Sequence, residues 1–273
     1  MAGKPQRTRK SSRTTLATAA RQYFRAALSN PLLLWCLGLF LLLGLMAFPI
    51  SAHLTRLVEV ILFGALAAGA LALCWTRRIL RWALVALYVG CAVFVLLPGH
   101  TDYDRIALRQ ETARALLRYE GTRYYGGGKG FLGIDGSGLV RRGIIDALFL
   151  HGVRHLNPWL VRRAALVWWT DLSARELGSG ARGRTRLIKE VPAIKGMDES
   201  HLDPGDFAIT RSGVQAFAFL GNHHWIEADP QLGKVIQVDA RSAAASGNPW
   251  FQEPVSIHRW RMLDLERRVG RQP

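Results

Sequence analysis

The chain has 273 residues, a formal net charge of +16, three cysteines and a hydrophobic content of 49%. A chain this apolar, with nine tryptophans and 11 phenylalanines, is not intrinsically disordered. Three cysteines exclude a disulfide scaffold and a zinc ribbon with paired cysteine motifs. Residues 1–100 hold eleven Lys or Arg and one acid, Glu59, so most of the excess charge lies in the first third. We therefore expect no nucleic-acid partner.

Three apolar runs occupy residues 31–50, 60–75 and 82–99. The first run is uncharged, and 20 residues of helix span about 30 Å, the thickness of the hydrocarbon core. We predict a basic cytoplasmic tail over residues 1–30 and three transmembrane helices in the bilayer over residues 31–100.

The predicted orientation follows from the positions of lysine and arginine. The tail holds seven basic residues and no acid, and the second turn holds Arg77, Arg78 and Arg81. The positive-inside rule places both in the cytoplasm. The sequence therefore predicts a multi-pass protein of the plasma (inner) membrane, with an extracytoplasmic or periplasmic domain over residues 101–273.

Two alternatives concern the N-terminal segment. Ile50-Ser51-Ala52 is an acceptable signal-peptide cleavage site, but the apolar run before it is long for that role. The basic tail has the composition of a nucleic-acid-binding segment, although we expect it to set orientation and contact anionic lipid.

The region after residue 100 changes from helical to strand-like patterns. Apolar spacing predicts helices over residues 102–119, 137–151 and 159–177, with loops at 124–130 and 178–186. Short β-rich segments then follow at residues 207–210, 214–220, 225–228, 235–238 and 255–260. Helices followed by strands predict an α+β fold with helices packed on an antiparallel sheet.

Three motifs occur in a fixed order within this region: Tyr124-Tyr125-Gly126-Gly127, then Asp135-Gly136-Ser137-Gly138-Leu139-Val140, then Pro204-Gly205-Asp206. Over residues 105–240 this order resembles the NlpC family of papain-like cysteine peptidases, which cut peptidoglycan stem peptides. That family shows Tyr and Gly-Gly before Asp-Cys-Ser-Gly-Leu-Val, then Pro-Gly-Asp and a strand that begins with the catalytic His. The resemblance implies a papain-like, NlpC-type domain.

The sequence departs from the family at the catalytic positions. Gly136 stands at the nucleophile position, Gln215 at the base position, and Glu227 at the third polar position twelve residues later. A cysteine at a helix N-terminus has its thiolate stabilised by the helix dipole and an adjacent histidine. Glycine supplies no nucleophile and glutamine does not titrate, so we expect a domain that has lost both catalytic groups.

The binding residues of the family are retained. The resemblance assigns Asp135, Ser137, and either Tyr124 or Tyr125 to recognition of the stem-peptide end. Helix N-capping is an alternative role for Asp135 and Ser137, and one side chain can do both. We expect no cofactor and no metal site, because His151 and His155, four residues apart, lack a third ligand.

These observations lead to three functional hypotheses. The first is a membrane-anchored pseudoenzyme that binds cell-wall peptide or a cell-wall remodelling protein. The second is an active peptidoglycan hydrolase with a shifted nucleophile, Ser137, assisted by His223 or His224 and by Glu227. The third is a transport or sensing protein with the C-terminal domain as a regulatory cap, which the lack of charge in the apolar runs disfavours.

Overall fold

The computed structural model describes residues 30–49 and 53–265. The predicted basic tail and the cleavage site at residues 50–52 therefore lie outside the described residues, apart from Asn30. The chain divides into two compact units. Among the described residues, the first unit comprises residues 30–45 and 58–88, and the second comprises residues 46–49, 53–57 and 89–265.

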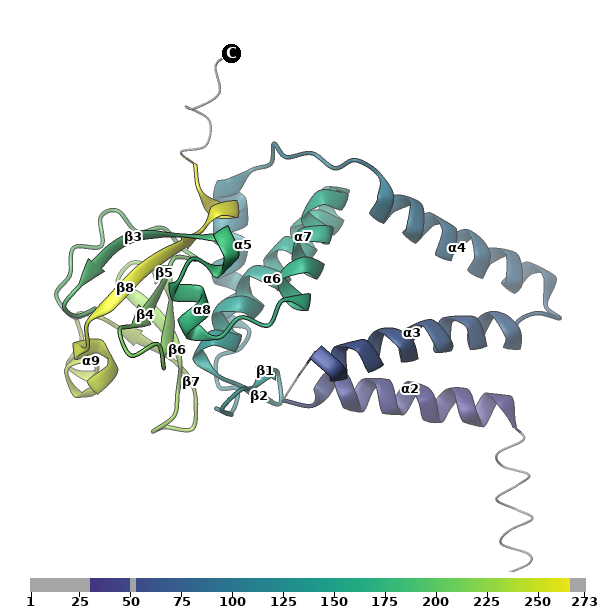
Figure 1. Cartoon of the computed structure of the whole chain (residues 1–273), viewed down its shortest axis with the longest axis horizontal. Helices are drawn as coiled ribbons and strands as arrows, with labels where there is room; N and C mark the ends of the chain where they lie inside the picture. Colours follow the sequence, from purple (N-terminus) through teal and green to yellow (C-terminus); the bar gives the residue numbers. More distant parts are fainter. Residues whose placement is uncertain (1–29, 50–52, 266–273) are drawn as a thin grey trace, which may run out of the picture. The chain divides into compact units, whose positions relative to one another are not determined.

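Three apolar helices begin the described chain: α2 (Pro31–Ala47), α3 (His53–Leu73) and α4 (Arg78–Leu96) (Figure 1). In the first unit, Trp35 Nε1 of α2 donates to the carbonyl of Leu66 in α3 at 2.8 Å. Next to this bond, a β-carbon at Gly69 would lie only 3.0 Å from the Trp35 ring. The small residue at position 69 thus lets the two helices pack closely.

The prediction of three membrane spans was wrong in number. Within residues 30–49 and 53–265, two helices, α3 and α4, are long and apolar enough to cross a membrane, judged by length and composition alone. Helix α2 has 17 residues and is too short to count as a third such helix. It ends at Ala47 because Phe48 precedes Pro49, and proline disfavours helical geometry at the preceding residue. The predicted side of the membrane depended on three spans and stays a prediction.

The helices of the second unit are α5 (Arg105–Leu117), α6 (Gly136–Arg154), α7 (Pro158–Trp169) and α8 (Ala174–Gly178). The predicted single helix over residues 159–177 was wrong, because it divides into α7 and α8. Ser173 and Glu176 form a capping box that begins α8, which fixes Ser173 in a non-helical conformation. Residues 170–172 therefore leave the helix.

A six-stranded antiparallel sheet forms the other half of this unit, with strand order β3-β8-β4-β5-β6-β7. Its strands are β3 (Thr185–Val191), β4 (Phe207–Thr210), β5 (Ala216–Gly221), β6 (His224–Asp229), β7 (Lys234–Asp239) and β8 (Val255–Trp260). A separate pair joins β1 (Lys129–Gly130) to β2 (Gly133–Ile134). The predicted α+β class with an antiparallel sheet is confirmed. The prediction missed β3, whose first residues it assigned to a loop.

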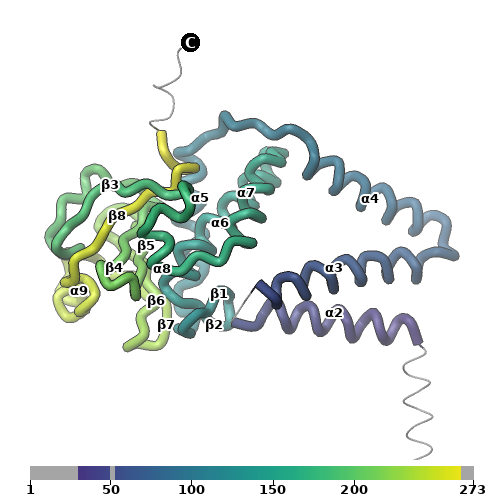
Figure 2. Tube along the Cα trace, viewed as in Figure 1, coloured from purple at the N-terminus to yellow at the C-terminus, as the bar shows by residue number. Residues whose placement is uncertain are grey.

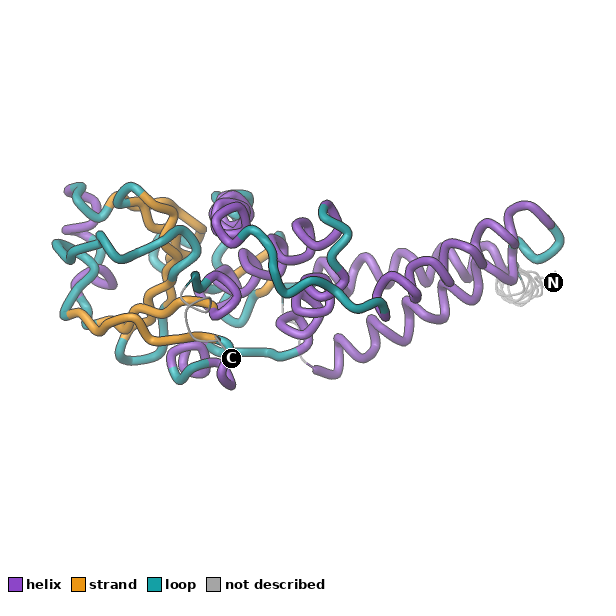
Figure 3. The backbone as a smooth tube through the Cα atoms, turned by 90° about the horizontal axis from the view of Figure 1, so that it is seen from above, coloured by secondary structure: helices purple, strands orange, loops and turns teal. Residues whose placement is uncertain are grey.

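The sheet of the second unit is covered on both faces. Helices α5–α7 lie along one side of it, where Leu139 and Ile144 of α6 share a core with Phe207 and Ile226 (Figures 2 and 3). A second core contains Phe217, Trp225, Phe251 and Ile257, with Ala245 from α9 (Ala243–Gly247). Burial on both faces explains why the central strands are nearly continuous apolar runs.

Candidate functional site

Asp135 begins the site as the N-cap of α6. Its Oδ1 accepts hydrogen bonds from the Gly138 N–H at 2.6 Å and the Ser137 hydroxyl at 2.9 Å. Its Oδ2 accepts from the Gly127 N–H at 2.9 Å. One carboxylate therefore caps the helix and ties the glycine-rich turn to it. A role for Asp135 in ligand recognition stays a prediction.

Gly136, the first residue of α6, lies directly against Gln215 and the first residue of β5. A β-carbon at position 136 would lie 2.7 Å from Gln215 Oε1, 2.8 Å from the Ala216 carbonyl oxygen and 2.9 Å from the Ala216 nitrogen. Two of these three atoms belong to the backbone, which cannot rotate away as a side chain can. The start of α6 thus approaches β5 more closely than any residue with a side chain allows.

Glu227 lies behind this contact, on β6. Gln215 is 3% exposed and Glu227 is fully buried. Gln215 Nε2 donates to the carbonyl of Ala228 at 2.7 Å, and Asn248 Nδ2 donates to Glu227 Oε1. Among the described residues, Glu227 Oε2 has no hydrogen-bond partner of standard geometry. Burial, with a smaller contribution from Asp229, raises the pKa of Glu227 to about 7, and the Asn248 and Gln215 side chains oppose this shift.

The structure thus brings together Gly136, Gln215 and Glu227, the three positions that the sequence resemblance matches to catalytic residues. Glycine has no nucleophilic atom, glutamine does not titrate, and the carboxyl group of Glu227 is shielded from solvent. The correspondence of these positions to the catalytic residues of a peptidase stays a prediction.

The predicted binding residues lie near the same end of α6. Tyr124 and Ser137 are half-buried, whereas Tyr125 is 45% exposed. Burial, and then the nearby Asp135 carboxylate, raise the pKa of Tyr124. Tyr124 is bridged to Ile134 of β2, directly before Asp135. The grouping places a phenol, a carboxylate and a hydroxyl beside the glycine-rich turn.

The histidines proposed as replacement bases lie elsewhere. His223 Nδ1 is 2.5 Å from Glu199 Oε2, and His224 Nδ1 is 2.7 Å from the carbonyl oxygen of Asn222. In the β5–β6 hairpin His224 pairs with Gly221, whereas Gln215 precedes the opposite end of β5. Six residues of strand separate the two ends by about 20 Å. The catalytic group of the second hypothesis is therefore not assembled.

The pair His151 and His155 is not part of a larger metal-binding group. Their ring centroids lie 4.2 Å apart with the ring planes tilted by 38°, and His151 Nδ1 is 3.2 Å from Glu111 Oε2. Across residues 30–49 and 53–265, no three His, Cys, Asp or Glu side chains come together in a way that could hold a metal ion.

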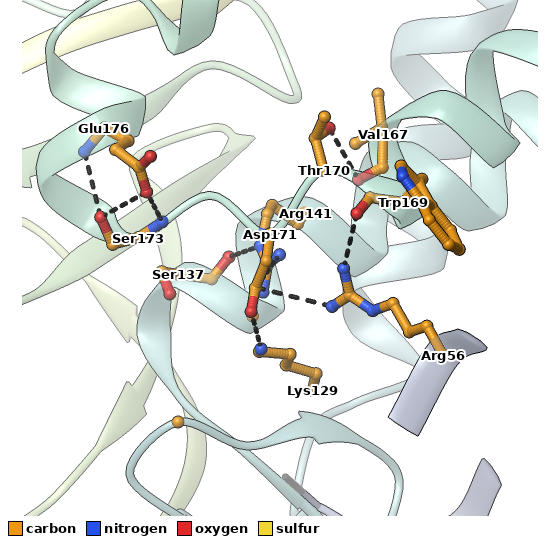
Figure 4. A network of polar contacts seen from close by, with 12 residues as sticks. Arg56, Lys129, Ser137, Arg141, Val167, Trp169, Thr170, Asp171, Ser173 and Glu176 are labelled. Atoms are coloured by element: carbon orange, nitrogen blue, oxygen red, sulfur yellow. Dashed lines mark hydrogen bonds and ion pairs between the residues drawn. The ribbon is translucent and has the colours of Figure 1, made fainter. Parts of the chain in front are cut away.

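An ion-pair network that the sequence did not predict lies next to Ser137 (Figure 4). Asp171 accepts from Arg141 Nη1 at 2.8 Å and from Lys129 Nζ, and it lies 3.5 Å from Arg56 Nη2. Arg141 Nε also donates to the Ser137 carbonyl at 3.4 Å. Burial alone would raise the pKa of Asp171, but the three cations outweigh it and hold that pKa below its ordinary value. The Ser-x-x-Glu pattern at residue 173 was the available signal, because it places Asp171 outside a helix.

Comparison with known proteins adds a coarse likeness. No family model matches the chain, and no curated protein matches it. The similar solved structures include NlpC2 from Trichomonas vaginalis, with 18% identity and a TM-score of 0.38, and NlpC1 from the same organism, with 18% identity and a TM-score of 0.37. Each match covers 59% of this chain, and 50% and 46% of those chains. The chain thus matches about half the length of these proteins, and no functional residue is transferred from them.

Proposed function

We propose that the domain after residue 100 is a catalytically degenerate NlpC-like binding module, held at a membrane by the preceding apolar helices. It binds cell-wall peptide, or a cell-wall remodelling protein, without cleaving it. The observation that carries this proposal is the direct contact of Gly136 with Gln215 and the Ala216 backbone.

A papain-like peptidase needs a thiol at the helix N-terminus and a titratable base beside it. Here the volume that the thiol would occupy is filled by Gln215 Oε1 and Ala216. The Glu227 carboxyl group behind them is fully buried. The proposed loss of activity therefore involves geometry as well as chemistry.

The proposed binding role rests on the residues that match the binding motif of the family. Three donors hold the Asp135 carboxylate in one position, so its orientation is set before a ligand arrives. Tyr124 and Ser137 beside it keep part of their surface exposed. These are the residues that the sequence resemblance assigns to the end of a stem peptide.

The geometry disfavours a hydrolase with a shifted nucleophile. The Ser137 hydroxyl donates to Asp135 rather than to a base, and the hydroxyl of a serine needs a neighbouring base to become nucleophilic. His223 pairs with Glu199 at the far end of the hairpin.

The test uses the full chain in detergent micelles with soluble muropeptides that carry free stem peptides. We expect calorimetric binding and, over a long incubation, no new fragments by mass spectrometry. Tyr124→Phe and Ser137→Ala should each weaken binding. Comparison of Tyr124→Phe with Tyr125→Phe shows which of the two tyrosines contacts the ligand. Ser200→Ala, far from this end of α6 in sequence, is the matched control. Turnover of the muropeptide that a single change at Ser137 abolishes, or the absence of any binding, would refute the proposal.

A further inference from the structure

A groove of about 610 Å³ lies on the second unit, and one of its lining residues, Thr210, accepts a hydrogen bond from the Gln215 N–H at 3.0 Å. Among its lining residues are Arg175, Glu190, Thr210, Arg211, Ser212 and Ser256. Gly136, Gln215 and Glu227 do not line it. Its volume is typical of sites that bind small molecules.

Three strand ends and α8 form this groove. Val255 of β8 pairs with Val191 of β3 on one side and with Thr210 of β4 on the other. Helix α8 is tied to the sheet by a hydrogen bond from Thr185 Oγ1 to the Leu177 carbonyl, 3.1 Å long. The groove is therefore built mainly on ordered secondary structure.

Two arginines of the groove have unused hydrogen-bond donors. Within the part of the chain that the structure describes, neither the Arg175 nor the Arg211 guanidinium takes part in an ion pair or hydrogen bond. Gly213, at φ +70°, brings the β4–β5 turn close to Arg175: a β-carbon there would lie 3.3 Å from Arg175 Cβ. A planar guanidinium matches the two oxygens of a carboxylate. This side of the groove is suited to an anionic group.

Hydroxyl groups also line the groove. Ser212 Oγ donates to Thr210 Oγ1 at 3.0 Å, and Ser256 Oγ is 2.9 Å from Nε2 of the buried His258. Such hydroxyls can donate to or accept from a peptide group. The lining therefore offers polar partners beyond the charged side chains.

Glu190, on β3, supplies the opposite charge across the groove. In the ladder, Ser256 of β8 has Glu190 of β3 on one side and Ile209 of β4 on the other. Adjacent strands lie about 4.8 Å apart, so β3 and β4 are separated by about 10 Å. Arg211 directly follows the last residue of β4. About 10 Å is also the length of three extended residues.

We propose that this groove binds a short peptide with both ends free, whose carboxylate lies at Arg175 and Arg211 and whose ammonium group lies at Glu190. The glutamate at the groove disfavours a phosphate dianion, since it would add like-charge repulsion. The inference does not depend on the role of Gly136 or on the binding role of Tyr124, Asp135 and Ser137.

The test measures binding of trialanine to the full chain in detergent micelles. Three ligands are compared: trialanine with both ends free, its N-acetylated form and its C-terminal amide. We expect both blocked forms to bind about tenfold more weakly or worse, since each loses a charge-assisted hydrogen bond. The double change Arg175→Gln with Arg211→Gln should remove the preference for the free carboxylate. Glu190→Gln should remove the preference for the free ammonium group alone. Arg114→Gln, on α5 and outside the groove, is the matched control.

Each alternative outcome contradicts the proposal. Equal binding of all three ligands would show that the charged ends are not recognised. Absence of binding at millimolar trialanine would exclude the site. Inorganic phosphate that binds in an Arg175-dependent manner and displaces trialanine equally from wild type and Glu190→Gln would indicate a simple anion site. The proposed function is tested separately, because its variants at Tyr124 and Ser137 lie outside this groove.

Discussion

Gln215 Oε1 lies 2.7 Å from the point where a side chain on Gly136 would begin. The two residues come from different layers, the first turn of α6 and the residue directly before β5, and Gln215 occupies the space that a side chain at position 136 would need. This close contact leads to predictions about stability and about cleavage that can be measured.

Gly136→Ala should destabilise the protein by about 2 kcal/mol, although alanine is the better helix former. The added methyl group forces the backbone of Ala216 or α6 to move, and such overpacking costs about 1–3 kcal/mol. Gly247→Ala in α9 is the control, because a β-carbon at that position would have no atom within 4 Å among the described residues. Urea unfolding of the full chain in micelles, followed by tryptophan fluorescence, measures both. Equal effects of the two changes would show that position 136 has free space.

The double change Gly136→Cys with Gln215→His should not restore cleavage of stem peptides. Removal of the Gln215 amide clears one of the three close contacts, but the Ala216 carbonyl and nitrogen remain at 2.8 and 2.9 Å. The cysteine therefore displaces α6 from β5 rather than forming a thiolate–imidazole pair. The measurement is muropeptide cleavage by mass spectrometry, together with the thiol pKa from the pH dependence of alkylation. Recovered cleavage would mean that only the chemistry had been lost.

Glu227 should make the protein less stable as the pH rises from about 4.5 to 7. The pKa of Glu227 is about 7 in the folded protein against a usual value of 4.5, so the folded state holds this proton more tightly and loses stability on deprotonation. The difference in stability between Glu227→Gln and wild type should grow over this range by an amount on the order of 3 kcal/mol.

The control for this pH dependence is Glu176, whose pKa is shifted in the opposite direction. Hydrogen bonds from Ser173 lower the pKa of Glu176, so its contribution is present above the ordinary pKa and lost as the pH falls. Glu176→Gln should therefore change the stability profile only in acid. A Glu227→Gln profile parallel to that of the wild type between pH 4.5 and 7 would contradict the burial argument.

Arg259→Met should destabilise the protein by about 3–5 kcal/mol, because it leaves a buried charge without its partner. Arg259 donates to both oxygens of the buried Asp206, at 2.7 and 2.6 Å, and lies 2.7 Å from Asp203. Arg154→Met is the control. Its side chain is 58% exposed and pairs with Glu111, and exposed pairs contribute about 0–1 kcal/mol. Similar unfolding midpoints for the two variants would disprove the role of Arg259.

Asp171→Asn should destabilise the protein by about 2–3 kcal/mol at neutral pH, since two of its three cationic partners, Arg56 and Arg141, are buried. The pKa of Asp171 is depressed, so its stabilising effect is complete above the ordinary pKa of an aspartate and disappears as the pH falls. The difference between variant and wild type should shrink accordingly. The exposed Asp198, changed to Asn, keeps its acceptor oxygen for Ser200 and should have little effect. A pH-independent difference would argue against the ion pairs.

Local patterns predicted the elements with a regular burial period. Strands β4 and β8 were predicted at their observed bounds, and α6 within a few residues, because apolar residues recur at helical spacing or fill a strand buried on both faces. Strand β3 has Arg186, Lys189 and Glu190 on an edge of the sheet, so no apolar pattern marks it. The length of the first span was overestimated because the apolar run was counted through Pro49. Composition alone does not show that a helix ends before this proline.

The functional residues were predictable only where a motif linked them. Gly136, Gln215 and Glu227 entered the prediction through the order of the motifs around them, and the distances between them come from the fold. Asp171 was missed because its segment was assigned to a helix. Arg175 and Glu190 lie 15 residues apart in the chain, on separate elements, and no local pattern joins them. A group of charged residues on separate strands can be predicted only when the strand order is known.

The strand order also determines when the domain can form during synthesis. Strand β8 is the last strand of the described chain, yet it lies between β3 and β4. Until residues 255–260 have left the ribosome, β3 has no neighbour to pair with, and β4 exposes one edge. A sheet joined by pairs this far apart in sequence folds slowly, so a nascent chain carries open strand edges while the segment between β3 and β8 is being synthesised. During that interval the unpaired edges of β3 and β4 can pair with another chain, and β8 removes this possibility when it inserts between them.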